Sequence, residues 1–307
     1  MGFMPPARPK QAPGYLLRVP RCTRLAVSRQ GCVAVSTAHP YLRSLGSEKQ
    51  LPLSTPKHPS HYHFPPDGKL LVVVSTQGRV AAFDTKKGGS ALWTAAMARE
   101  TSGGVFSHDS ARFYLGDWQG NLVCFEARTG RELARVASPR MFDHAALLAD
   151  GTLSIEHRPA TSPASWHLYS PELELLRQHA LPEDTRRIIP DDEGRTAMVQ
   201  LHEEVAVIEA KTKGQLKTLA RTPVPGLYLG TIAAIDSQRV LATGKTEWRI
   251  LDRKTAKPLH TLALAKTLLL GTSPDGKWVS LYDDHGGALL WETEALIRTC
   301  QKGSSVR

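Results

Sequence analysis

Short apolar runs separated by small turns recur along the chain. In one unit the runs cover 69–75, 79–83 and 91–97, with a tight turn at 76–78 between the first two. The next unit repeats this arrangement with runs at 112–115, 122–125 and 132–136. Runs of this length, rich in Val, Leu, Ile and aromatic residues and cut by Gly and Asp turns, predict β-strands. No window keeps a period of 3.6 residues over three turns, so we expect helices to be nearly absent.

A turn that often reads Pro-Asp-Gly precedes one apolar run in each unit. Its last residue is Gly31, Gly68, Ser110, Gly151, Gly194, Ser237 and Gly276 in turn. Successive copies are 37, 42, 41, 43, 43 and 39 residues apart. A fixed period of this length is typical of proteins built from repeated structural units. The sequence therefore predicts seven units.

A second signal, an aromatic or aliphatic residue followed by an acid, supports the same repeat. It occurs at Phe83-Asp84, Phe125-Glu126, Ile208-Glu209, Leu251-Asp252 and Trp291-Glu292, with Tyr169-Ser170 as a degenerate copy. The acid, or the serine in the degenerate copy, follows the turn residue by 16, 16, 19, 15, 15 and 16 residues in units two to seven. The fourth unit is longer because it carries an insertion around 158–165.

A four-stranded unit of this size cannot cover both of its faces alone, whereas radial stacking of such units buries them. We therefore expect an all-β fold, a seven-bladed β-propeller of four-stranded antiparallel blades, over residues 15–300. Residues 1–14 predict a disordered basic tail and 301–307 a flexible tail. Either 15–19 or 295–299 could supply the outer strand of the last blade, and we favour the N-terminal segment.

Composition describes an ordinary globular chain with excess positive charge. The formal net charge is +10 and the pI is near 9.6, which affects the choice of partner rather than the fold. No stretch approaches the roughly 20 apolar residues of a membrane span, so we expect a cytoplasmic protein with no membrane partner. None of the four cysteines forms a Cys-x-x-Cys pair. Cys22 and Cys32 could form a disulfide, but reduced thiols are the simpler interpretation.

Two of the units resemble the WD-repeat family. Residues 273–277, Ser-Pro-Asp-Gly-Lys, are followed by Trp291-Glu292, and 64–69 are followed by Phe83-Asp84. The Gly-His dipeptide and the intact Trp-Asp pair of that family are absent, so the chain looks like a divergent, bacterial-type member. A weaker similarity links Ala82 to Trp93 with the docking motif of quinoprotein propellers. These resemblances imply a propeller, and they leave its function open because one fold hosts many functions.

Motifs for catalysis are missing from the sequence. There is no Gly-x-Ser-x-Gly elbow, no His-Glu-x-x-His and no phosphate-binding Gly-Lys-Ser/Thr loop. A propeller enzyme would need several acids or histidines where first strands begin, and we expect those positions to be mostly small or apolar. We therefore expect a non-enzymatic protein with no catalytic residues and no cofactor. His58, His61 and His63 are weak candidates for a metal site, and an ordinary polar loop before the second blade is the preferred interpretation.

Basic residues gather in the turn between the third and fourth strands of four units. They are Lys86, Lys87, Arg128, Arg131, Lys211, Lys213, Arg253 and Lys254. Equivalent turns of a propeller lie on one face, so these residues predict an incomplete basic ring. Trp118, in the turn 117–120, is expected to be exposed, and an exposed tryptophan is a common anchor in protein interfaces.

These observations favour a protein-interaction module, either a scaffold or a capping inhibitor, whose partner has an acidic surface. The propeller would act as a monomer or as a subunit of a hetero-complex. Two alternatives stay open at this point. One is binding of nucleic acid or another polyanion through the basic ring, although nucleic-acid sites usually interleave aromatic residues with the charge. The other is a ligand-binding or hydrolytic propeller with its site in the central channel.

Overall fold

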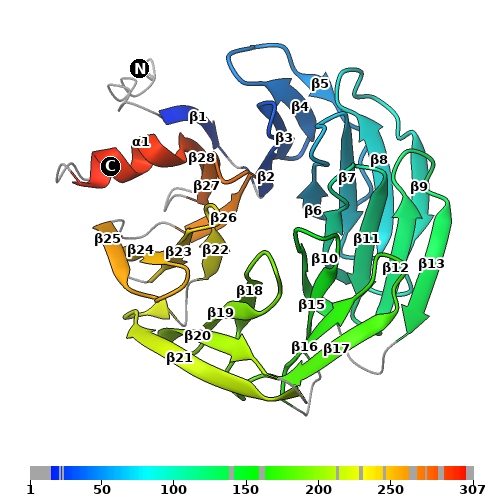
Figure 1. The fold of residues 1–307 in the computed structure, drawn as a ribbon. Helices are drawn as coiled ribbons and strands as arrows, with labels where there is room; N and C mark the ends of the chain where they lie inside the picture. The colour runs from blue at the N-terminus through cyan, green and yellow to red at the C-terminus, as the bar shows by residue number, and fades with distance from the viewer. Residues whose placement is uncertain are drawn as a thin grey trace.

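The computed structural model contains seven four-stranded sheets arranged in a ring (Figure 1). It describes residues 15–20, 22, 24–137, 142–158, 163–211, 214–227, 231–244, 247–262, 268–273, 275–282 and 287–301. Neighbouring strands within each sheet are antiparallel. The predicted seven-bladed all-β propeller is confirmed. The expected tail at 1–14, and all but the first residue of the one at 301–307, lie outside the described residues.

Each blade consists of four strands that we number from the central channel outwards. Blade 1 contains β2 Arg24–Val27, β3 Cys32–Ser36, β4 Tyr41–Ser44 and β5 Leu51–Pro52, and blade 2 contains β6 Pro59–His63, β7 Leu70–Ser75, β8 Arg79–Asp84 and β9 Trp93–Ala96. Blade 3 contains β10 Thr101–Phe106, β11 Arg112–Asp117, β12 Asn121–Glu126 and β13 Glu132–Ala137, and blade 4 contains β14 Phe142–Leu147, β15 Leu153–His157, β16 Ser165–Tyr169 and β17 Leu175–Ala180. Blade 5 contains β18 Arg187–Pro190, β19 Thr196–Gln200, β20 Glu204–Ala210 and β21 Leu216–Pro223, and blade 6 contains β22 Ile232–Ala234, β23 Arg239–Thr243, β24 Trp248–Asp252 and β25 Pro258–Leu262. Blade 7 contains β26 Leu268–Thr272, β27 Trp278–Tyr282, β28 Gly287–Glu292 and, as its outer strand, β1 Tyr15–Pro20. The strands predicted for the second and third units agree with these bounds to within two residues.

The repeat turns join the first and second strands of their blades. Six of the seven turn residues have positive φ, namely Gly31, Gly68, Ser110, Gly151, Gly194 and Gly276. Because strands alternate in direction, the turns between strands three and four lie at the same end of each blade. We call this end of the ring the lower face. The turns between strands two and three, with the connections between blades, form the upper face.

The core consists of seven separate clusters, one at each interface between neighbouring blades. The middle strands pack on both sides, which is why they read as continuous apolar runs instead of alternating ones. In β7, for example, all six residues are buried. Each blade therefore packs against both of its neighbours.

The ring closes through the N-terminal strand, as favoured from the sequence. β1 pairs with β28, and Leu17 lies opposite Leu290 while Val19 lies opposite Ala288. Val19 is buried in the cluster that joins blades 7 and 1. The alternative, a C-terminal outer strand at 295–299, is wrong. Because β1 already occupies the outer edge of β28, the following residues have no edge to pair with.

Residues Thr293–Gln301 instead form the helix α1. It packs against β25 and β28 (Figure 1). Leu296 and Ile297 are buried in the cluster between blades 6 and 7. Glu294 lies in the first turn and Arg298 in the last, which suits the helix dipole. The helix therefore covers the junction next to the closing strand.

Candidate interaction faces and central channel

The basic residues singled out in the sequence do lie in equivalent turns of the lower face. Lys86, Lys87, Arg128 and Lys254 are exposed there. The preceding acid closes each turn: the Asp84 carboxylate accepts hydrogen bonds from the backbone amides of Lys86 and Lys87 at 2.8 and 3.1 Å. The acid thereby holds the backbone of the turn, and the two lysine side chains extend from it.

Other members of the predicted ring are neutralised. The Arg131 guanidinium lies 3.4 Å from the Glu126 carboxylate, and the Lys211 ammonium lies 2.6 Å from that of Glu209. Arg253 is not a surface residue of the ring: its side chain is only 11% exposed and pairs with Asp192 of blade 5 at 3.4 Å. Lys213 lies outside the described residues. The lower face therefore has less unpaired positive charge than the sequence suggested.

Aspartates of the repeat turns add negative charge to the same face, closer to the axis. They are Asp67, Asp109, Asp150, Asp191, Asp236 and Asp275. A hydrogen bond from the Ser107 hydroxyl lowers the pKa of Asp109, and one from the backbone amide of Thr152 lowers that of Asp150. Both carboxyl groups are thus ionised at neutral pH. Negative charge inside an outer set of basic residues makes this face mixed in sign.

Trp118 lies on the opposite, upper face and is 48% exposed. The turn that carries it is fixed by Asp117, whose buried carboxylate accepts hydrogen bonds from the amides of Gln119 at 3.0 Å and Asn121 at 2.9 Å. The expected exposure of Trp118 is confirmed. Because it faces away from the basic turns, the residues predicted to bind a partner do not form one surface.

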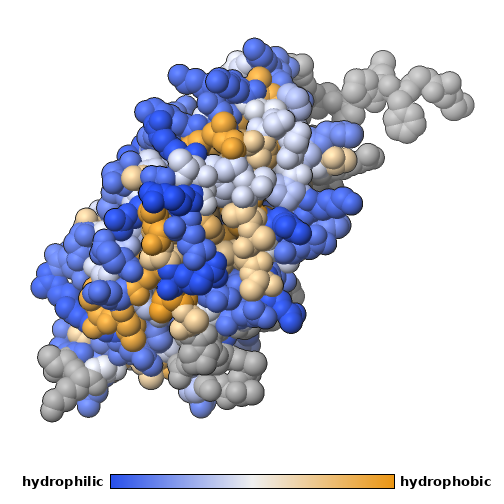
Figure 2. Space-filling model, turned by 90° about the vertical axis from the view of Figure 1, so that its right-hand side faces the viewer, coloured by the Kyte–Doolittle hydropathy of each residue, from blue (hydrophilic) through white to orange (hydrophobic). Residues whose placement is uncertain are grey.

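The outer surface of the ring presents single leucines rather than a continuous apolar patch. Five of them, Leu92, Leu133, Leu176, Leu219 and Leu259, occupy equivalent positions near the start of the fourth strand in blades 2 to 6. Figure 2 shows the side where blades 2 and 3 lie, and hydrophobic side chains are interspersed there with hydrophilic ones. Isolated exposed leucines of this kind are common on protein surfaces.

The expectation that the histidines occupy a loop before the second blade is wrong for two of them. His61 and His63 belong to β6, because this segment pairs with β7 along its length. Their rings stack with centroids 6.0 Å apart, while His58 is exposed in the preceding connection. Within the described part of the chain, no three His, Cys, Asp or Glu side chains are grouped to hold a metal ion.

Burial keeps these two imidazoles neutral. Burial, with the positive charge of Arg24, lowers the pKa of His61 to about 4. Burial, with the neighbouring His61, lowers the pKa of His63 to about 3. A neutral imidazole can donate one hydrogen bond and accept another.

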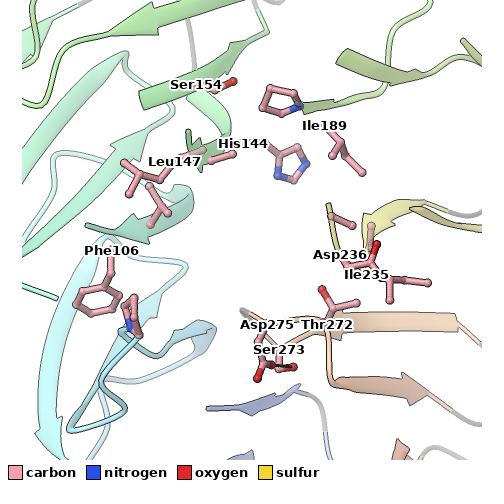
Figure 3. A pocket seen from close by; sticks show the side chains of 18 of the residues that line it. Phe106, His144, Leu147, Ser154, Ile189, Ile235, Asp236, Thr272, Ser273 and Asp275 are labelled. Atoms are coloured by element: carbon pink, nitrogen blue, oxygen red, sulfur yellow. Dashed lines mark hydrogen bonds between the residues drawn. The ribbon is translucent and has the colours of Figure 1, made fainter. Parts of the chain in front are cut away.

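A central channel with a volume of about 820 Å³ runs between the first strands. Part of its wall is aliphatic, as at Ala145, Ile189 and Ala233, and part is polar, as at Asp236 and Asp275. Figure 3 shows His144, which projects from β14 into the channel. Arg187 of β18 also lines the cavity.

The expectation that first strands begin with small or apolar residues is wrong in four blades. The residue seven positions before the repeat-turn residue is Arg24, His61, Gly103, His144 and Arg187 in blades 1 to 5. His61, Gly103 and His144 each follow a β-bulge of the first strand, which confirms their equivalence. Counting backwards from the turns, instead of looking for acids or histidines in general, would have found this position.

The cysteines described by the structure, Cys22, Cys32 and Cys124, are free thiols. The disulfide considered for Cys22 and Cys32 is not formed. Burial raises the pKa of Cys32 to about 11. Burial is also the largest of the effects that raise the pKa of Cys124 to about 11. Both thiols are therefore protonated and unreactive at neutral pH. Among the described helices, none has the length and apolar character needed to span a membrane.

Comparison with known proteins supports the propeller assignment. A family model described as outer membrane protein assembly factor BamB matches residues 76–159. The β-propeller domain of Myceliophteria thermophila Cps50 (Swd1) is 12% identical with a TM-score of 0.68, over 90% of this chain and 98% of that one. These matches show that the chain has the fold of a β-propeller.

A chain of the mitotic checkpoint complex also matches this propeller, at 12% identity and a TM-score of 0.71, over 95% of this chain and 98% of that one. At such low identity the likeness concerns the fold. A comparison with curated proteins finds no match. The BamB-type match includes Ala82 to Trp93, the segment that is similar to the quinoprotein docking motif.

Proposed function

We propose that this propeller is a non-enzymatic protein-interaction module that binds its partner through the upper face. The observation that carries the proposal is Trp118, a large aromatic side chain held in an exposed position by the buried Asp117. Exposing an indole is unfavourable in water, and tryptophan is enriched among residues that dominate binding energy. A rigid turn also keeps the entropy lost on binding small.

Charge indicates what kind of partner fits. Arg24 and Arg187 lie where first strands begin, at the upper ends of blades 1 and 5, but acidic residues such as Glu183 also lie on this face. The acidic surface that we propose for the partner is therefore supported by the net charge of +10. Free thiols at Cys22, Cys32 and Cys124 suit a reducing compartment such as the cytoplasm, which we propose as the location.

The test is affinity purification with mass spectrometry at low and at high salt, comparing the parent chain with Trp118→Ala. Leu133→Ala is the matched control, because it also removes an exposed hydrophobic side chain but from the outer rim. We expect a protein captured at high salt by the parent and the control but lost with Trp118→Ala. Capture that is equal in all three chains would refute the use of this face. Bulk nucleic acid that is lost steeply with salt would instead favour the polyanion alternative.

A further inference from the structure

A groove with a volume of about 780 Å³ lies on the upper face between blades 1 and 2, and we call it the blade 1–2 groove. It is bordered by the turn 37–40 of blade 1, by Thr76 in the equivalent turn of blade 2 and by the connection between the two blades. The outer strand β5 has two residues, whereas the outer strands of the other six blades have four to eight. The chain therefore leaves blade 1 early and borders the groove as it crosses to blade 2.

The connection that borders the groove is fixed to both blades. The amide of Leu53 donates a hydrogen bond to the carbonyl of Pro40 in blade 1 at 2.9 Å. The amide of Thr76 in blade 2 donates one to the carbonyl of His58 at 3.1 Å. Prolines, each with a fixed φ, make up much of the lining: Pro40, Pro52, Pro56 and Pro59. The groove is thus preformed, and a ligand that enters it loses little binding energy to ordering of the protein.

The side chains that bring charge to the groove are all basic. Lys57, His39 and His58 line it and are exposed, and no Asp or Glu is among its lining residues. Of the described lysines, Lys69 and Lys211 form ion pairs, whereas Lys57 does not. The positive charge of Lys57 is therefore available to a ligand. This distinguishes the groove from the lower face, where acids lie among the basic turn residues.

Hydroxyl groups supply further donors along the groove. Those of Ser54, Thr55 and Thr76 make no hydrogen bond to any other residue that the structure describes, and each can donate one. Phe, Tyr and Trp are absent from the lining, so the groove lacks the aromatic platforms on which nucleic-acid bases usually stack. Carboxylates carried by a peptide match this lining better than a polynucleotide does.

We propose that the blade 1–2 groove binds an extended acidic segment of the protein partner. The inference rests on the proposed function, because the groove lies on the same face as Trp118. The turns that carry Thr76 and Trp118 are equivalent turns of neighbouring blades, so one partner can contact both. Asp or Glu side chains of the segment accept hydrogen bonds from Lys57 and from the hydroxyls. Clefts of roughly 300–1,000 Å³ hold drug-sized ligands, and the groove therefore has room for a short stretch of peptide.

The experiment uses the purified full-length chain and a fluorescein-labelled hexaglutamate peptide, whose binding is followed by fluorescence anisotropy at low salt. The test variant is Lys57→Glu. The matched control is Lys49→Glu, because Lys49 is also exposed but lies between β4 and β5 on the lower face. We expect saturable binding to the parent and the control, and roughly fivefold or greater weakening in the test variant. No saturable binding to the parent, or equal weakening in both variants, would overturn the proposal.

A single-stranded hexathymidylate with the same label tests the polyanion alternative. We expect it to bind more weakly than hexaglutamate, because the groove offers no aromatic ring for its bases. Tighter binding of this strand than of the peptide, lost in Lys57→Glu, would assign the groove to nucleic acid and overturn the proposal.

A second measurement uses the parent chain alone and so does not depend on the folding of a variant. The imidazole signals of His39 and His58 in the groove are followed by NMR as hexaglutamate is added, with His108 in a lower-face turn as the reference. We expect the first two signals to shift saturably while that of His108 stays unchanged. Equal shifts at all three rings, or none in the groove, would contradict the site.

The groove and the interaction through Trp118 can fail separately. Trp118→Ala leaves the groove intact, so this variant should bind hexaglutamate as the parent does. A partner captured by the parent should be retained less well by Lys57→Glu than by Lys49→Glu at low salt, and equal retention would overturn the groove as part of the partner site. If no partner is captured at all, the proposed function fails while the affinity for hexaglutamate remains measurable.

Discussion

Glu156 offers the sharpest test of how neighbouring blades are joined. Its side chain is fully buried in β15, where it pairs with Arg158 and accepts the amide hydrogen of Ile188 from blade 5. Glu156→Ala removes the carboxylate and leaves both groups without this acceptor. Breaking a buried ion pair from one side costs about 3–5 kcal/mol, a large fraction of the roughly 5–15 kcal/mol that stabilises a typical domain.

The assay is urea unfolding followed by circular dichroism, with thermal unfolding as a second measure. We expect the loss to lower the thermal midpoint by roughly 5–8 °C. Glu156→Gln is the control, because the amide oxygen still accepts from Ile188 while the charge is lost, and it should cost roughly 1–3 kcal/mol. A Glu156→Ala protein as stable as the parent to within about 0.5 kcal/mol would refute the reasoning, since surface substitutions have effects of that size.

Two further predictions concern packing and pH. Gly276→Ala should cost roughly 3 kcal/mol or more in urea unfolding, because its Cβ would overlap the carbonyl oxygen of Ile235. Gly46→Ala, also at positive φ but with open space around it, should cost about 1 kcal/mol. Equal costs for the two substitutions would contradict the contact. The pKa of His63 is about 3 in the folded chain and about 6.5 in the unfolded chain. Between pH 6.5 and pH 3 the unfolded state therefore binds more protons than the folded state. The free energy of unfolding falls as the pH decreases through this range. Between pH 7.5 and 4.5 this side chain should account for about 2–3 kcal/mol of the loss in unfolding free energy. The ring of His63→Phe fits beside Phe113, and this variant should reduce the pH dependence by that amount. An unchanged pH dependence would show that another group is responsible.

The fold could be predicted because each unit carries two independent turn signals at a nearly constant offset. The signals work because turn geometry is local: Asp84, for example, bonds amides only two and three residues away. The order of strands follows from their sequence once the unit is known. The closing strand was harder, since β1 and the segment that forms α1 have similar apolar content, and only the pairing of β1 with β28 decides between them.

The candidate sites were predicted less well because they depend on contacts between distant blades. Arg253 reads as a turn residue, yet it reaches Asp192, 61 residues earlier. The local sequence around it gives no sign of this contact. Trp118 was predicted correctly because its exposure depends on one short turn. The shared position of Arg24, His61, His144 and Arg187 was missed because these residues are spread over four blades, and each one alone resembles an ordinary polar residue at a strand end.

The central claim, a ring closed by pairing the N-terminal strand with β28, is tested most directly by a disulfide between Leu17→Cys and Leu290→Cys. These residues face each other, within the Cα separation that a disulfide spans. The control pair, Leu17→Cys with Ala288→Cys, is offset by two residues and lies roughly 7–8 Å apart. Single-cysteine variants show whether either thiol links to Cys22 instead.

The ring predicts that the Leu17–Leu290 pair oxidises within one chain and that the control pair does not. The product should migrate faster on a non-reducing gel and gain up to roughly 5 kcal/mol of stability, because the bond closes nearly the whole chain into a loop. Oxidation no greater than in the control, or links formed only between chains, would contradict the closed ring.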